Sequence, residues 1–353
     1  MSPRIYLDHA ATTPVLPQAQ AAMADALSRW GNPSSPHADG RAARAALEKA
    51  RAEIADALGW RHDVVLTSGA SEAIAIAAGR ARLEPRLVGA TEHDAAIAAM
   101  GFAAGTIPVD INGLVDLGMP DAPALVAIQQ VNNETGVVQP VDMIAGAVRA
   151  SQSLLLADCA QSAGKLPLPD ADFIAVSAHK LGGPPGIGAL LVRDIATLAP
   201  SGGQEKGYRR GTENVPAAAG FAAALQARAF ADAMPLLAEL RTTFEAGIRD
   251  AGGLVIAEDS PRIATIGAYA MPGVSSASQL VQFDLAGIAV SAGSACSSGS
   301  MKPSHVLEAM GVPAAIAASV IRVSFGPQSS AADVDRFLAE WRRVALAAKT
   351  RAA

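Results

Sequence analysis

A lysine and an aspartate follow two short apolar segments, and together their side chains could hold an aldehyde cofactor. Lys180 comes after the run Phe173–Val176 and before a turn rich in glycine and proline. Asp158 directly follows the run Leu154–Ala157. A single lysine is most often a solvated surface residue. Pyridoxal phosphate (PLP), however, needs a lysine that binds its aldehyde and a carboxylate that keeps its pyridine nitrogen protonated. The pair, 22 residues apart, therefore favours a PLP site.

The segment Thr67–Glu72 could bind the phosphate of such a cofactor. It places a glycine and small residues, among them Ala70 and Ser71, between a strand-like run and the start of a helix. Free backbone N–H groups and the helix dipole favour an anion at such a point. Alone, the segment would indicate no more than an ordinary helix N-terminus. Ser177 and His179, which flank the lysine, could add further donors.

The two cysteines differ in their surroundings, and only one is expected to be reactive. Two thiols cannot form a disulfide framework or a metal site made of cysteines alone, and no metal site is expected. Cys159 adjoins Asp158 on a segment that reads as a buried strand, so we expect a packing residue. Cys296 lies among glycine, serine and alanine, in a segment too small and polar to form a core. Because reactive thiols need exposure, Cys296 is the candidate nucleophile.

The pattern of apolar runs predicts an α/β fold in which helices flank a mostly parallel sheet. Strand-like runs alternate with helical stretches over the first two thirds of the chain, at 64–67, 125–128, 154–157, 173–176 and 188–192. Ligands of such sheets collect beyond the carboxyl ends of the strands. Polar residues stand at those ends, namely Ser68, Asn133, Asp158 and Ser177.

The last third of the chain predicts a smaller α+β domain. An alanine-rich helical stretch from Asn214 to Asp250 is expected to break near Pro235, and a terminal helix is expected from about Ala331. A chain of 353 residues exceeds what one compact core usually supports. We therefore expect a large PLP-binding domain over 14–232 and a small domain over 233–353, completed by residues 1–13.

Composition and charge argue against several classes of function. Half of the residues are apolar and 17% are charged, which is typical of a folded chain with a large core. The net charge of -5 gives no electrostatic footprint for nucleic acid. We expect no signal peptide and no membrane span, because the N-terminus lacks a basic start followed by an apolar run, and no apolar run is long enough. The two cysteines suggest a reducing cytoplasm.

Eight segments, in order along the chain, carry a resemblance to a known family. They are Tyr6–Pro14, Gly31–Ser35, Thr91–His93, Val131–Gly136, Ala157–Gln161, Ser177–Gly186, Gly211–Asn214 and Ser291–Cys296. Together they resemble the cysteine desulfurases, which are class V, fold-type-I PLP enzymes. The resemblance runs from residue 5 to about residue 326. The cysteine segment is of the type found in the branch with the housekeeping and nitrogen-fixation desulfurases.

The resemblance implies a reaction and a role for each matching residue. L-cysteine would be the substrate, and Lys180 would bind PLP. Cys296 would take the sulfur as a persulfide and pass it to an acceptor such as an iron–sulfur scaffold, while His93 would stack on the PLP ring and move protons. The other implied contacts are to the ring from Asn133, Asp158 and Gln161, to the phosphate from Ala70, Ser71, Ser177 and His179, to the substrate from Asn32, Asn133 and Arg322, and, across a homodimer, to the partner's phosphate from Thr212.

Two other interpretations stay open. Another class V PLP enzyme, an aminotransferase or a selenocysteine lyase, would not need Cys296. A non-catalytic relative would act as a scaffold for sulfur-transfer partners, although the intact set of candidate catalytic residues argues against it. The chain is also shorter than typical members of the family, mainly between Ala81 and Thr91 and between Gly105 and Leu125. A surface that docks partners is therefore expected to be trimmed.

Overall fold

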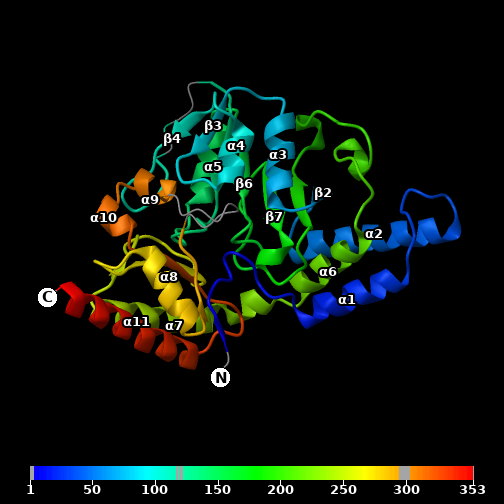
Figure 1. Ribbon diagram of the computed structural model, residues 1–353. Helices are drawn as coiled ribbons and strands as arrows, with labels where there is room; N and C mark the ends of the chain where they lie inside the picture. Colours follow the sequence, from blue (N-terminus) through cyan, green and yellow to red (C-terminus); the bar gives the residue numbers. More distant parts are fainter. Residues whose placement is uncertain (1–3, 117, 119–121, 294–302, 353) are drawn as a thin grey trace.

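The larger part of the fold is built on a seven-stranded sheet (Figure 1). The computed structural model describes residues 4–116, 118, 122–293 and 303–352. β8 runs antiparallel to both of its neighbours, and all other neighbouring strands in this sheet run parallel. The predicted α/β fold with a mostly parallel sheet is therefore confirmed. The strands, in order across the sheet, are β2 (Asp63–Thr67), β8 (Gly188–Val192), β7 (Phe173–Ser177), β6 (Leu154–Asp158), β5 (Leu125–Gln129), β3 (Arg86–Gly89) and β4 (Gly105–Ile107).

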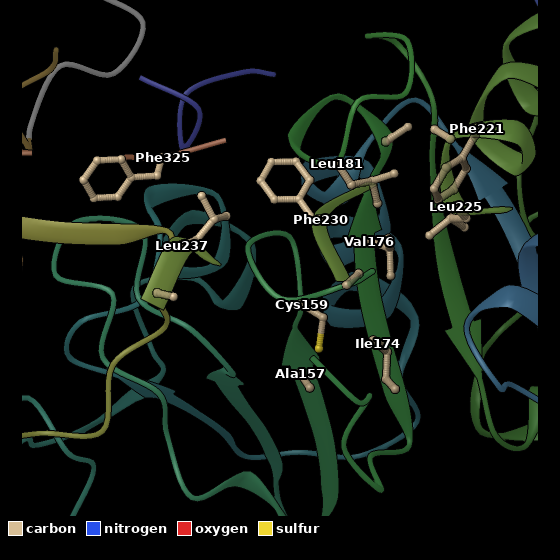
Figure 2. Packing of buried hydrophobic residues seen from close by; sticks show 14 of the residues in the cluster. Ala157, Cys159, Ile174, Val176, Leu181, Phe221, Leu225, Phe230, Leu237 and Phe325 are labelled. Atoms are coloured by element: carbon tan, nitrogen blue, oxygen red, sulfur yellow. The ribbon is translucent and has the colours of Figure 1, made fainter. Parts of the chain in front are cut away.

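Helices cover both faces of this sheet. Because successive residues of a strand point to opposite faces, one strand can contribute side chains to the core on each side. Ile174 and Val176 of β7 pack into one buried cluster, part of which Figure 2 shows, whereas Phe173 and Ala175 of the same strand pack into another. A strand buried on both faces is expected to be continuously apolar, as β7 is. The first cluster takes residues from α1 (Pro17–Ser28), α2 (Ala38–Ala57), α5 (Val141–Ala150) and α6 (Val215–Gln226), and also from α7 (Ala229–Asp250), α8 (Ser276–Leu285) and α11 (Ala331–Ala352); the second takes residues from α3 (Ala70–Arg80) and α4 (Asp94–Met100).

A second group of elements, mostly from the last third of the chain, surrounds a smaller sheet. Its buried interior is continuous with the first cluster and is rich in aromatic residues, with the rings of Phe283 and Phe337 stacked at 4.6 Å between centroids. The N-terminal strand β1 (Ile5–Tyr6) joins this group, since it pairs with β11 (Ile288–Ala289). The other elements are β9 (Leu254–Val255), β10 (Ile266–Ala270), β12 (Val320–Ser324), α7 (Ala229–Asp250), α8 (Ser276–Leu285), α9 (His305–Ala309), α10 (Ala314–Ala317) and α11 (Ala331–Ala352).

The break in the long alanine-rich helical stretch is not where the sequence predicted it. The chain leaves the helix between α6 and α7, where Arg228 takes a left-handed backbone conformation with φ of 50°. Pro235, the predicted break, lies inside α7. A proline there forfeits one backbone hydrogen bond. The buried face of α7, which includes Leu237 and Phe244, holds the helix together across that point.

A buried ion pair on α7 gives a testable prediction about stability. Glu245 accepts two hydrogen bonds from Arg262, at 2.6 and 3.0 Å, and their side chains are 7% and 4% exposed. Glu245→Ala is expected to lower the free energy of unfolding by about 3–5 kcal/mol, because it leaves a buried guanidinium without its partner. Urea denaturation measures this loss. Glu239→Ala, on the exposed side of the same helix, is the control; equal midpoints for the two variants would contradict the prediction.

Candidate active site

A cavity of about 450 Å³ lies at the carboxyl ends of β5, β6 and β7. Its size falls in the range of pockets that bind small molecules and cofactors. The sequence predicted a ligand site at this edge of the sheet, because polar residues stand at the ends of the strands there. The structure brings ten of the predicted site residues to its walls: Ala70, Ser71, His93, Asn133, Asp158, Gln161, Ser177, His179, Lys180 and Arg322.

Lys180 is carried by a 3₁₀ turn, η1 (Ala178–Lys180), which follows β7 directly. Within the turn, His179 Nδ1 lies 3.1 Å from the hydroxyl of Thr12, so the turn is tied to the N-terminal segment. Burial is the main cause that lowers the pKa of His179 to about 4, with the charges of Lys180 and Lys165 adding to it. His179 is therefore an uncharged hydrogen-bonding group at neutral pH.

His93 is held in one orientation at the start of α4. Its Nδ1 accepts a hydrogen bond from the backbone N–H of Ala95 at 3.1 Å, so we assign the ring proton to Nε2. Burial, and then the charge of Lys180, lowers the pKa of His93, whereas the charge of Asp158 opposes this effect. A neutral imidazole with a proton on Nε2 can donate one hydrogen bond into the cavity.

One end of the cavity is suited to a phosphate. The N-cap of α3 is Gly69, and no side chain caps this helix, so its first backbone N–H groups have no partner within the helix. A side chain at position 69 would project toward Ser177, whose Oγ lies 3.8 Å from the place of a Cβ. The glycine therefore keeps the space between the helix N-terminus and the serine hydroxyl open. Such a space, lined by N–H and O–H donors, fits an anion.

The rest of the cavity fits the ring and aldehyde of PLP. Asp158 is anchored through one carboxylate oxygen, which accepts the backbone N–H of Ala160 at 2.8 Å. Gln161 donates to the carbonyl of Ala10 at 2.9 Å, and its amide oxygen is buried without a partner among the described residues, so a donor on a ligand would satisfy it. With Lys180 at the same walls, the residues present match the aldehyde, the pyridine nitrogen and the phosphate of the cofactor.

Arg322 forms a buried cationic fork on the wall of the cavity. Its Nη2 donates to Asp8 at 2.9 Å and its Nη1 to the carbonyl of Asn133 at 3.1 Å, while Nε is buried without a partner in the described part of the chain. Asp8 supplies a counter-charge to a side chain that is 7% exposed. A guanidinium has five N–H donors, so the fork keeps donors for the carboxylate of a substrate.

Two of the predicted residues, Asn32 and Thr212, do not line the cavity in this chain. Asn32 is exposed, and its side-chain oxygen accepts the backbone N–H of Ser34 at 2.9 Å. Thr212 is also exposed, as a residue that reaches a partner subunit would be. Cys296 lies outside the described residues. The roles of Asn32, Thr212 and Cys296 remain predictions.

The loop that carries Thr212 is fastened to the large sheet by a buried ion pair that the sequence did not reveal. Glu205 accepts two hydrogen bonds from Arg51 of α2, at 2.6 and 3.0 Å, and one from the backbone N–H of Leu66 in β2 at 2.7 Å. Arg209 of the same loop pairs with Glu72, a cavity residue, at 3.0 Å. These partners are more than a hundred residues apart, so no local pattern indicates them.

Comparison with known proteins identifies the family of this chain. The family model described as aminotransferase class-V matches residues 5–337. The cysteine desulfurase of Rhodobacter capsulatus is 36% identical over 370 residues, covering 96% of this chain and 95% of that protein. The X-ray structure of a NifS-like protein from Rickettsia africae has a TM-score of 0.84 at 29% identity, covering 97% of this chain and 99% of that one. The structure described as SspA in complex with cysteine has a TM-score of 0.77 at 30% identity, covering 92% and 100% of the two chains.

The fold, the lysine at the end of a strand and the family match define a PLP-dependent enzyme of the aminotransferase class-V family, to which the chain belongs. Within that family the chain belongs to the cysteine desulfurases, because such proteins are similar to it over nearly its whole length. The resemblance expected from the sequence is thereby confirmed.

Proposed function

We propose that this enzyme transfers the sulfur of L-cysteine to Cys296. In the reaction the Cβ–S bond of the substrate breaks, its electron pair stays with carbon, which takes up a proton, and an S–S bond forms. L-cysteine and the thiol of Cys296 then become L-alanine and a persulfide. The observation that carries the proposal is the meeting of Lys180, Asp158, His93 and Arg322 in one cavity. Cysteine is also the ligand named for the similar protein SspA.

Arg322, Lys180 and His93 each have a distinct task. When bound, PLP supplies an electron sink for the α-carbon of the amino acid. Arg322 binds the substrate carboxylate through its fork, which Asp8 and the carbonyl of Asn133 hold in place. Lys180 binds the cofactor and then carries the α-proton. The neutral ring of His93 carries its proton on Nε2 and donates a hydrogen bond there to the reacting groups.

The proposed function is tested by measuring two products together. Purified protein is incubated with L-cysteine and a reductant, and alanine and sulfide are assayed in the same samples. We expect both to form in equal amounts, because the reductant releases the persulfide sulfur as sulfide. An aminotransferase would yield pyruvate derivatives instead of alanine. Alanine without sulfide would refute the proposed route of the sulfur.

The active form is proposed to be a homodimer with shared sites, and this leads to a second prediction. If Thr212 completes the phosphate site of the partner, Lys180→Ala and Thr212→Ala are each inactive alone. Mixed dimers of the two variants contain one site with both residues intact. Random re-association should therefore restore about a quarter of the wild-type activity. Re-association of each variant with itself is the control, and a monomer in sedimentation at micromolar concentration would contradict the dimer.

The sulfur is proposed to leave the enzyme in the cytoplasm. There the persulfide is passed to an acceptor protein such as an iron–sulfur scaffold. No helix among the described residues is long and apolar enough to cross a membrane.

We propose two domains, 14–232 and 233–353, the latter completed by residues 1–13, and the pairing of β1 with β11 supports this division. The boundary proposed at 232/233 falls inside α7.

A further inference from the structure

We propose that Glu134 is a positioning residue that fixes both ends of the segment bearing Cys296. Glu134 follows the cavity residue Asn133 and is itself absent from the cavity walls. Its side chain is buried, with 5% exposure for the residue. Burial raises the pKa of its carboxyl group, while a hydrogen bond from Ser304 and the charges of His305 and Arg322 lower it. A buried carboxylate is costly unless partners hold it, so the identity of those partners matters.

The first partner lies at the C-terminal end of the segment. The hydroxyl of Ser304 donates to Glu134 Oε2 at 2.6 Å and accepts the backbone N–H of Leu307 at 3.1 Å. Ser304 is thus the N-cap of α9 and is bonded to Glu134 at the same time. The next residue, His305, lies with Nε2 2.9 Å from the carbonyl of Glu92, which precedes His93. The chain is therefore fastened beside the cavity immediately after the segment.

The second partner lies at the N-terminal end of the segment. A methyl group at Gly293 would overlap Glu134 Oε2, the same oxygen that accepts from Ser304, so the backbone of Gly293 packs directly against the carboxylate. Two residues earlier, Ser291 exchanges two backbone hydrogen bonds with Arg322, at 3.2 and 2.6 Å. Both ends of the segment therefore meet at a single carboxylate oxygen.

These contacts connect both ends of the segment to Arg322, the residue proposed to bind the substrate carboxylate. The main chain of Arg322 holds Ser291, its guanidinium binds the carbonyl of Asn133 at 3.1 Å, and the adjacent Glu134 contacts both Gly293 and Ser304. The carboxylate thus sets the distance between the ends of the cysteine-bearing segment and the group that binds the substrate carboxylate. This inference rests on the proposed function, because it assigns the segment between Gly293 and Ser304 a part in sulfur transfer.

The test compares Glu134→Ala and Gly293→Ala with Glu308→Ala, which removes an exposed carboxylate from α9. After rapid mixing of PLP-loaded enzyme with L-cysteine, mass spectrometry follows the extra sulfur on the peptide that contains Cys296. We expect persulfide formation to slow by about 10²-fold in the first two variants, because an ångström of misplacement has an effect of this size. PLP content and the KM for cysteine should stay close to the wild-type values, and Glu308→Ala should match the wild type.

A conservative substitution separates positioning from a general loss of structure. Glu134→Gln keeps an oxygen that can accept from Ser304, so it should recover most of the rate that Glu134→Ala loses. The inference is overturned if Glu134→Ala and Gly293→Ala form the persulfide at the rate of Glu308→Ala, or if their defect is wholly a raised KM. A wild-type enzyme that places no sulfur on Cys296 overturns the proposed function instead.

Discussion

Lys180→Ala is expected to show no measurable turnover of L-cysteine and no absorbance band of lysine-bound PLP, while its fold survives. Lys180 is the amine on the cavity wall proposed to bind the cofactor and to carry the α-proton. Proton transfer by a positioned side chain alone contributes about 10²–10⁴-fold to a rate. Loss of that function together with the bond to the cofactor should therefore lower kcat by about 10⁴-fold.

The fold of this variant should survive because Lys180 ends a short turn and is only half-buried. Circular dichroism and urea denaturation measure the fold, and absorbance measures the bound cofactor. Lys49→Ala, which changes an exposed lysine on α2, serves as the control and should keep full activity. Lys180→Arg keeps the positive charge, yet it should remain inactive because a guanidinium does not lose its proton near neutral pH. Wild-type turnover by Lys180→Ala would remove Lys180 from the mechanism.

The sequence predicted the sheet and the location of the cavity well, because both depend on local signals. Apolar runs of four or five residues predicted buried strands, and they are β5 to β8 with small changes of their bounds. Parallel strands place their carboxyl ends at one edge. Polar residues such as Asp158 and Ser177, which follow different strands, were therefore expected to meet, and the structure brings them to one cavity.

The partners of the site residues could not be predicted in the same way, because they come from distant parts of the chain. Asp8 and Arg322, which form an ion pair, are 314 residues apart, and Glu134 and Ser304 are 170 residues apart. Nothing in the composition of either segment indicates its partner. Both acidic residues belong to segments that carried the family resemblance, which was the one signal that could have drawn attention to them.

The helix boundary was missed for a different reason. A proline is the strongest local signal of a helix break, and Pro235 supplied that signal. The actual break at Arg228 requires a left-handed conformation at a residue with no glycine, asparagine or proline character. Tertiary packing determines the position of the break, because α6 and α7 pack against different neighbours and the chain must turn between them.

The second large effect is expected from Cys296, and Cys159 provides a matched control within the same chain. Cys159 is fully buried in the cluster that Figure 2 shows, and its Sγ lies 3.4 Å from Gln130 Oε1. Burial raises the pKa of the Cys159 thiol far above its ordinary value, so this thiol does not form the nucleophilic thiolate. The burial confirms the packing role that the sequence predicted. Cys159→Ser should retain activity and lose about 1 kcal/mol of stability.

Cys296→Ser should bind PLP and L-cysteine as the wild type does, since those steps are assigned to Lys180, Asp158 and Arg322. Persulfide formation should disappear, because a serine hydroxyl stays protonated near neutral pH and is a poor nucleophile toward sulfur. After brief exposure to cysteine, mass spectrometry of the wild type should find the extra sulfur on the peptide that contains Cys296. If it lies on Cys159 instead, or if Cys296→Ser makes alanine at the full rate, the sulfur follows another route. The protein would then act as an aminotransferase or lyase of the same family, for which Cys296 has no chemical task.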